Sequence, residues 1–266
     1  MTLAPEPVSL EISPEGIAVV TLNRAAKRNA IDEIMIAGLA ETFETLRGAD
    51  HVRVVFLTGA GPHFCAGADI DWMRRQGEHL QADNETDALT FARMLKALHD
   101  LPVLTVALVH GAAMGGGAGL VAACDWAIAT KDAHFRFSEV RLGITAATIS
   151  PYVVEAIGAR NARALFASAF PFGAEEALRM GLIHAVAEDQ NELHIHLKRI
   201  AGLAMENAPG AVAESKALVR AVAGHPIDDR ISKETAKRIA ARRASPEGKE
   251  GLAAFLEKRR PNWDMP

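Results

Sequence analysis

Two short apolar segments open the chain and are typical of paired strands. VSLEIS (8–13) alternates apolar and polar residues, and IAVVTLN (17–23) is a β-branched run. Turn residues at 14–16 separate them, so the pattern predicts a hairpin. Asp32 is a candidate helix cap before an apolar stripe that ends at Gly48. The stripe has helical spacing and consists of Ile34, Met35, Gly38, Leu39, Phe43 and Leu46.

The central third of the chain alternates between strand and helix patterns. Residues 52–59 (VRVVFLTG) and 103–109 (VLTVALV) predict buried strands. Residues 84–100 predict an amphipathic helix between them, and a small-residue helix ends at Cys124. The apolar side of the amphipathic helix is expected to hold Leu89, Met94, Leu95 and Leu98.

The last part of the chain becomes helical. Residues 125–130 and 134–140 indicate short strands or extended segments. Ser150-Pro151 then opens a helix, because proline suits a first helical turn, and residues 161–181 are mostly helical with a break at 171–173. From 191 onward the pattern is all helix, with breaks at Pro209, Pro226 and Pro246. These patterns predict an α/β core over residues 1–190 and a C-terminal helical region over 191–266.

Composition narrows the function classes. The 266 residues are 49% hydrophobic and 23% charged, with a net charge of -4, which does not favour nucleic acid or an acidic membrane surface as a partner. Two cysteines make no disulfide framework, so we expect a reducing, cytoplasmic setting. The first residues show no signal or transit peptide pattern. Residues 101–124 lack charges, but their proline, histidine and glycines indicate a buried strand, turn and helix rather than a membrane span.

The first chemistry-bearing segment is His110-Gly-Ala-Ala-Met-Gly-Gly-Gly117, between a predicted strand and a predicted helix. Glycines allow a sharp turn, and N–H groups at a helix start can stabilise a developing oxyanion. Alone, the segment fits equally well a tight turn that needs close packing. A dinucleotide-binding loop is less favoured, because no acidic residue follows a second strand at the expected place.

The second segment, Phe64 to Ile70, also follows a strand and begins a helix at Asp69. The N–H of Ala68 is a candidate second donor to the same oxyanion. By itself the segment is better explained as a loop with an aspartate helix cap. The third segment, 137–143, holds Glu139 among apolar residues, where burial would raise its pKa for acid–base work. Local sequence alone favours an ion pair with Arg136 or Arg141.

Metal and nucleophile motifs are missing from the sequence. There is no HExxH, CxxC or GxSxG pattern. His194 and His196 are two apart in a predicted helix and would face different sides, so we expect no metal site. Cys65 has no candidate base near it in the sequence and is not favoured as a nucleophile.

Taken in order, these segments resemble the enoyl-CoA hydratase/isomerase (crotonase) family over nearly the whole chain. The matching segments are IAVVTLNRAAKRNAID, FLTGAGPHFCAGADI, LPVLTVALVHGAAMGGGAGLVAACDWAIAT, FSEVRLGI, ALRMGLIHAV and FLEKRRPNW. The resemblance implies a spiral of ββα units with a C-terminal helical trimerisation region. It also implies homotrimers or dimers of trimers, and an acyl-coenzyme A substrate rather than a separate cofactor.

The resemblance also implies roles for individual residues. The thioester oxygen would accept N–H bonds from Ala68 and Gly116, and Glu139 would be the catalytic carboxyl. Ala66 would contact the adenine end, while Lys27 or Arg24, or Lys258 of a neighbouring subunit, would reach the phosphates. The remaining expected substrate contacts are Asp69, Ile70, Trp72, Gly115, Gly119 and Arg136. Trp72, Met73 and Phe137 are candidates for the acyl pocket, although core packing explains each of them as well.

The chain departs from the family pattern at one position. Typical enoyl-CoA hydratases carry two glutamates, and Gly119 stands where the first would lie. Two branches of the family are similar in this respect: hydratases resembling bacterial methylglutaconyl-CoA hydratases of leucine breakdown, and Δ3,Δ2-enoyl-CoA isomerases. The match through residues 150–154 favours the first, with a short or branched 2-enoyl-CoA as substrate and Arg136 facing a distal carboxylate. A non-catalytic CoA- or RNA-binding member is a third alternative, since the C-terminal region contains basic segments.

Overall fold

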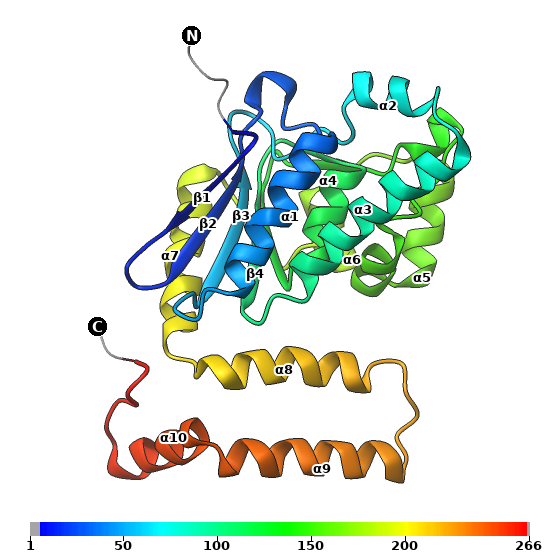
Figure 1. The fold of residues 1–266 in the computed structure, drawn as a ribbon. Coiled ribbons are helices and arrows are strands. Elements are labelled where there is room, and N and C mark those ends of the chain that lie inside the picture. The colour runs from blue at the N-terminus through cyan, green and yellow to red at the C-terminus, as the bar shows by residue number, and fades with distance from the viewer. Residues whose placement is uncertain (1–5, 265–266) are drawn as a thin grey trace.

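A computed structural model describes residues 6–264, and its core is a sheet covered by helices on both faces (Figure 1). Strand β1 is antiparallel to β2, and every other neighbouring pair in this sheet is parallel. The strands lie in the order β1 (Val8–Ile12), β2 (Ile17–Leu22), β3 (Val54–Gly59), β4 (Leu104–Val109), β6 (Trp126–Thr130) and β9 (Ala185–Ala187). The predicted hairpin and the predicted α/β class are therefore confirmed.

The structure also has a second, smaller sheet. Its three strands are β5 (Ala112–Met114), β7 (His134–Arg136) and β8 (Phe172–Gly173), in that order. Short 3-10 helices cover Ala25–Lys27 and Glu139–Leu142. The sequence pattern did not predict β5, β8 or β9, because two- and three-residue strands are too short to show a period and depend on distant partners.

Four helices and the larger sheet enclose the main apolar cluster. These helices are α1 (Glu33–Arg47), α3 (Gln81–His99), α4 (Gly116–Ala123) and α5 (Ser150–Ser168), the last kinked at Gly158. Asp32 caps α1 by accepting from the N–H of Met35 at 2.9 Å, as predicted. Two residues assigned to buried helix faces are instead on the surface: Ile34 is 60% exposed and Leu89 is 48% exposed. Ile36 and Ala97 are buried in these helices, so the actual apolar stripes are rotated from the predicted ones.

Helix α7 (Gln190–Met205) packs on the opposite face of the sheet and belongs to the core. Its Leu193, Ala201 and Ala204 join Val54, Phe56 and other strand residues in a second apolar cluster. Two shorter helices, α2 (Ile70–Gln76) and α6 (Ala174–Met180), complete the core.

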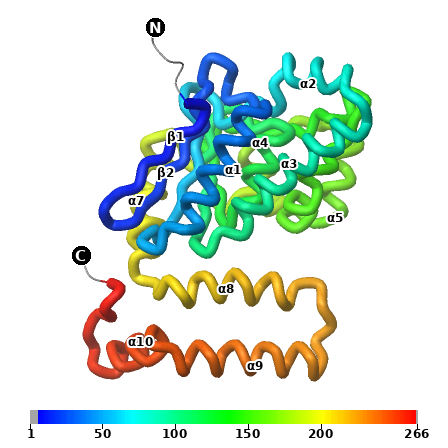
Figure 2. The backbone as a smooth tube through the Cα atoms, viewed as in Figure 1, coloured from blue at the N-terminus to red at the C-terminus, as the bar shows by residue number. Residues whose placement is uncertain are grey.

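Three further helices leave the core and run as a separate layer beneath it (Figures 1 and 2). They are α8 (Pro209–Val222), α9 (Asp229–Ala244) and α10 (Pro246–Glu257). Helices α8 and α10 begin with the prolines that the sequence marked as breaks. We call residues 209–257 the arm and residues 6–205 the core. The proposed boundary after residue 190 falls at the first residue of α7, whereas the helices that leave the core start at Pro209.

Candidate active site

The first glycine-rich segment fixes the amide of Ala68 through its two neighbours. The N–H of Ile31 donates to the carbonyl of Gly67 at 2.8 Å, and the N–H of Asp69 donates to the carbonyl of Ile31 at 2.7 Å. In such a parallel bridge the N–H of the intervening residue points the other way. Within residues 6–264 no acceptor bonds to the N–H of Ala68, so it is free to bind a ligand.

The second glycine-rich segment presents Gly116 at the first turn of α4. Gly115 has φ +45° and ψ −115°, a conformation that favours glycine, and its N–H donates to the carbonyl of Arg136 at 2.9 Å. Gly116 then begins the helix, and its N–H has no acceptor among the described residues. A Cβ on Gly116 would lie 3.0 Å from Ile31 Cδ1 and 3.1 Å from Phe91 Cζ.

Backbone hydrogen bonds hold these two segments side by side. The N–H of Cys65 donates to the carbonyl of Ala112, and the N–H of Met114 donates to the carbonyl of Cys65, both at 2.9 Å. Ala68 and Gly116 consequently line the same cavity. Two unpaired N–H donors from separate segments, one of them at a helix N-terminus, form an arrangement that can bind an oxyanion.

Glu139 supplies a carboxyl group beside the second segment. Its Oε1 lies 2.8 Å from the position a Cβ on Gly115 would take, so the glycine makes room for the carboxyl. Its Oε2 is buried and has no hydrogen-bond partner within residues 6–264. Burial raises the pKa of Glu139 above the ordinary glutamate range. The ion pair with Arg136 or Arg141 that local sequence favoured is not formed, and the carboxyl is left available for proton transfer.

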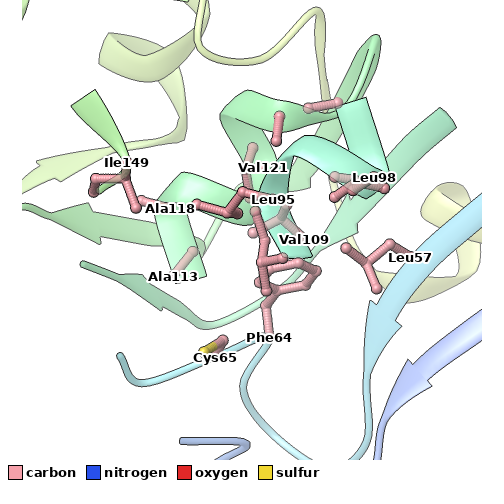
Figure 3. Packing of buried hydrophobic residues seen from close by; sticks show 14 of the residues in the cluster. Leu57, Phe64, Cys65, Leu95, Leu98, Val109, Ala113, Ala118, Val121 and Ile149 are labelled. Atoms are coloured by element: carbon pink, nitrogen blue, oxygen red, sulfur yellow. The ribbon is translucent and has the colours of Figure 1, made fainter. Parts of the chain in front are cut away.

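Gly119 faces an aliphatic side chain. A Cβ at this position would lie 2.2 Å from Ile149 Cγ2 and 2.7 Å from Ile149 Cβ. Figure 3 shows Ile149 pointing at α4 beside Ala118. The space over Gly119 is therefore already filled by Ile149, which also lines the cavity. No side chain from position 119 contributes a second carboxyl group.

The cavity that joins these groups has a volume of about 770 Å³. Its lining is largely apolar, with Glu139 as its one carboxylate and Arg74 as its one cation among the described residues. The other lining side chains that matter for the site are Ile31, Ile70, Trp72, Met73, Asn84, Phe91, Leu142, Ile144 and Ile149. A cavity of this size and polarity is typical of a small-molecule site.

The structure thus brings several predicted residues together. Ala68, Gly116, Glu139, Ile70 and Trp72 all line the cavity, as does Met73. Sequence reasoning missed Phe91, Leu142, Ile144 and Ile149. Leu142 and Ile144 are apolar but exposed, at 59% and 52%. The sequence could have indicated them only through their proximity to Glu139 along the chain.

A charged cluster surrounds Asp69 at the start of α2. Asp69 accepts from the N–H groups of Asp71 and Trp72, and its carboxylate lies 3.2 Å from Arg24 and 3.9 Å from Lys27. Burial acts to raise the pKa of Asp69, but these amides and cations outweigh it and hold the pKa below its usual range. Lys27 also pairs with Asp71 at 3.0 Å and is 55% exposed. Its contact with a substrate phosphate stays a prediction.

Other predicted contacts lie away from the cavity lining. Arg136 Nε donates to the carbonyl of Ala169 at 2.7 Å, so its role as a carboxylate partner gains no support and stays a prediction. The N–H of Ala66 donates to the carbonyl of Arg28, and Lys258 is the C-cap residue directly after α10. Phe137 is 1% exposed and packs edge-on to Phe166, which favours its core interpretation.

Other chemistries find little support within residues 6–264. Burial raises the pKa of the Cys65 thiol to about 12, so it stays protonated near neutral pH. No group of three or more His, Cys, Asp or Glu side chains in this range could hold a metal ion. None of the described helices has the length and apolar character needed to span a bilayer.

Comparison with known proteins agrees with the fold. The family profile for enoyl-CoA hydratase/isomerase matches residues 13–266. A crotonyl-CoA hydratase from Syntrophomonas wolfei subsp. wolfei is 32% identical over 263 residues, covering 98% of this chain and 99% of that protein. An acyl-CoA substrate is consistent with this family. The chain belongs to the enoyl-CoA hydratase/isomerase family, and it is an enzyme of that family.

Solved structures support the same assignment. An enoyl-CoA hydratase from Shewanella pealeana is 37% identical with a TM-score of 0.93, covering 97% of this chain and 96% of that one. Pseudomonas aeruginosa AtuE is also 37% identical with a TM-score of 0.93, covering 98% of this chain and 100% of that one. The chain therefore has the crotonase fold over its whole described length.

Proposed function

We propose that this protein is an enoyl-CoA hydratase, which adds water to, or removes it from, a 2-enoyl-CoA thioester. The observation that carries the proposal is the unpaired, buried carboxyl of Glu139 in the same cavity as the free N–H groups of Ala68 and Gly116. Relatives named as enoyl-CoA or crotonyl-CoA hydratases support the reaction class.

The proposed reaction needs only these three groups and a water molecule. The thioester oxygen accepts hydrogen bonds from the Ala68 and Gly116 amides. The Glu139 carboxylate takes a proton from water while the water oxygen bonds to C3 and the double-bond electrons move into an enolate. Glu139 then returns that proton to C2, which restores the carboxylate and the thioester. Stabilising the enolate oxygen lowers the barrier of both steps.

The proposed substrate is a short or branched 2-enoyl-CoA, including a carboxylated one such as methylglutaconyl-CoA. The apolar wall formed by Phe91, Leu142 and Ile149 supports a branched alkyl group. For a distal carboxylate, Arg136 remains the proposed partner, although Arg74 is the cation that lines the cavity. An Arg136→Ala enzyme with unchanged discrimination between carboxylated and plain substrates would remove that assignment.

A Δ3,Δ2-enoyl-CoA isomerase is the second candidate, and the packing of Ile149 over Gly119 favours it. An isomerase needs one carboxyl, which removes a proton from C2 of a 3-enoyl-CoA and returns it to C4. The cavity has one carboxylate, Glu139, among the described residues. Because no second carboxyl helps to position water, proton transfer without water is chemically consistent with this site.

One experiment separates these candidates. Purified protein is incubated with crotonyl-CoA, methylglutaconyl-CoA and a 3-enoyl-CoA in water enriched in ¹⁸O. Products are separated by liquid chromatography, which resolves 2-enoyl from 3-enoyl thioesters, and are then read by mass spectrometry. A hydratase incorporates the heavy oxygen into 3-hydroxyacyl-CoA, whereas an isomerase forms the 2-enoyl product with unchanged mass. Binding of CoA thioesters with no turnover of any substrate would favour a non-catalytic member, and Glu139→Gln serves as the matched inactive control.

We also propose assembly as a homotrimer or a dimer of trimers. The arm exposes large apolar side chains, with Leu252, Phe255 and Leu256 at 57%, 80% and 78% exposure on α10. Such a group on one helix face is typical of a subunit interface. Light scattering after size-exclusion chromatography tests this, and Phe255→Glu is expected to reduce the assembled mass. A monomeric wild-type protein would contradict it.

A further inference from the structure

The wall of the cavity next to Glu139 is formed by Ile149 packed over Gly119. Ile149 is 3% exposed and lies directly before α5, so its backbone is fixed by the start of that helix. Its Cγ2 and Cβ lie 2.2 Å and 2.7 Å from the place of a Cβ on Gly119, which is closer than any real contact. Ile149 and Gly119 are therefore a size-matched pair, in which one side chain takes the space of the other.

This pair shapes the site where the chemistry takes place. Gly116, whose N–H faces the cavity, lies less than one helical turn before Gly119 on α4. Glu139 and Ile149 line the same cavity. An acyl group whose thioester oxygen is held at Gly116 and whose carbons are within reach of Glu139 must consequently pass along the Ile149 side chain.

We propose that Ile149 is a specificity-determining residue, which limits the size of the substituent accepted on the acyl carbons beside Glu139. Its aliphatic surface contacts an alkyl branch, and its position over Gly119 leaves no depth behind it for a larger one. The inference rests on the proposed function, because it concerns the acyl group of an enoyl-CoA substrate.

A stability experiment tests the packing without using activity. Gly119→Ala is expected to lower Tm by several degrees, since an added methyl group overpacks this site. When Ile149 is already replaced by alanine, Gly119→Ala is expected to lower Tm much less than it does in the wild-type chain, because the space over Gly119 is then free. If Gly119→Ala melts at the wild-type temperature, or if it lowers Tm equally in the two backgrounds, the size-matched pair is wrong.

A substrate experiment tests the specificity. Ile149→Ala is expected to raise the ratio of kcat/KM for a 3-ethyl-substituted over an unsubstituted 2-enoyl-CoA by about 10-fold, the scale on which apolar pockets discriminate small groups. Ile157→Ala is the matched control, because Ile157 is similarly buried, at 4% exposed, and lies on α5, but it is not among the residues that line the cavity. It should leave the ratio within about 2-fold of wild type.

The possible outcomes separate the two proposals. An active Ile149→Ala enzyme with an unchanged ratio, or a ratio moved equally by Ile157→Ala, would overturn the specificity role. If the wild-type enzyme turns over no 2-enoyl-CoA, both the proposed hydratase function and the specificity role are wrong, while the Tm experiment still reports on the pair. Ile149→Val, which removes one methylene, gives a smaller shift in the same direction if Ile149→Ala fails to fold.

Discussion

The core and the arm are stabilised by different interactions. The core encloses two clusters of buried apolar side chains on either side of its sheet. The arm buries almost nothing in the single chain: α8 has no buried residue, α9 has only Ile231 and α10 has only Ala254. Burial of apolar surface therefore folds the core, and other interactions must fix the arm to it.

Polar contacts make that connection. Lys216 Nζ lies 2.6 Å from Asp125 Oδ2 and 2.8 Å from the carbonyl of Val103, with the lysine side chain 12% exposed. Arg53 donates to the carbonyls of Asn207 and Trp263, which lie on the segments directly before and after the arm, at 2.6 Å and 3.1 Å. A small number of hydrogen bonds and ion pairs hold one end of the arm, and its apolar faces stay exposed to solvent.

This difference separates chemistry from assembly. The residues that line the catalytic cavity lie between Ile31 and Ile149, all within the core. The large exposed apolar side chains on α10 belong to the arm. Changes at the site should therefore alter turnover without loosening the arm, and changes at the joint should do the reverse. Substitutions in each part test whether the two parts are separate in this way.

The largest effect is expected for Glu139→Gln. The amide cannot take a proton from water, so kcat should fall by about 10²–10⁴-fold, the usual contribution of a positioned acid or base. Steady-state kinetics with the best substrate from the panel measures it. Binding of an unreactive acyl-CoA should stay near the wild-type value, because Glu139 does not hold the thioester oxygen. Retained turnover would remove the residue from the mechanism.

A somewhat smaller effect is expected from removing one amide donor. Gly116→Pro and Gly116→Ala both add a Cβ near Ile31 and Phe91, but only proline lacks the N–H. Proline is tolerated in a first helical turn. Relative to the alanine variant, kcat should fall by about 10²–10³-fold, as when other oxyanion donors are lost. Equal rates in the two variants would show that this amide does not contact the reacting oxygen.

Much of this site could be predicted from the sequence, because its key groups are local. Gly116 follows a strand and starts α4, and Asp69 caps α2, so the free amides follow from turn and cap chemistry that nearby residues specify. Glu139 was identified as well, although local charges suggested an ion pair with Arg136 or Arg141. Its isolation depends on the fold, which places the Arg136 guanidinium against Ala169 instead.

What could not be predicted depends on contacts between distant segments. Ile149 over Gly119 joins α4 to the start of α5, and neither position shows a pattern that indicates the other. The bridge between Cys65 and Ala113 likewise sets the two amides side by side through residues far apart in sequence. The polar joint at Lys216 was missed for the same reason, since a lysine in a charged helix is usually solvated.

At the joint, Lys216→Met should lower the free energy of unfolding by about 1–3 kcal/mol, because it leaves Asp125 without its charged partner. Chemical denaturation measures this, and kcat should stay within about 2-fold of wild type because the cavity is remote. Lys131→Met is the control, because the side chains of Lys131 and its partner Glu188 are 60% and 73% exposed. This substitution should lower the free energy of unfolding by less than about 1 kcal/mol. A large fall in kcat for Lys216→Met would show that the arm influences the site.

The smallest expected effect is a pH-dependent stability difference that originates in the core alone. Because burial raises the folded-state pKa of Glu139, folding favours its protonated form. That contribution is full below the unfolded-state pKa and is lost as pH rises through the folded-state pKa. Glu139→Gln cannot ionise, so its Tm should rise relative to wild type as the pH increases from the ordinary glutamate pKa of about 4.3 through the raised folded-state pKa. Lys216→Met should show no such rise in relative Tm. A Tm difference for Glu139→Gln that is constant with pH would mean that the carboxyl ionises as easily in the folded core as in water.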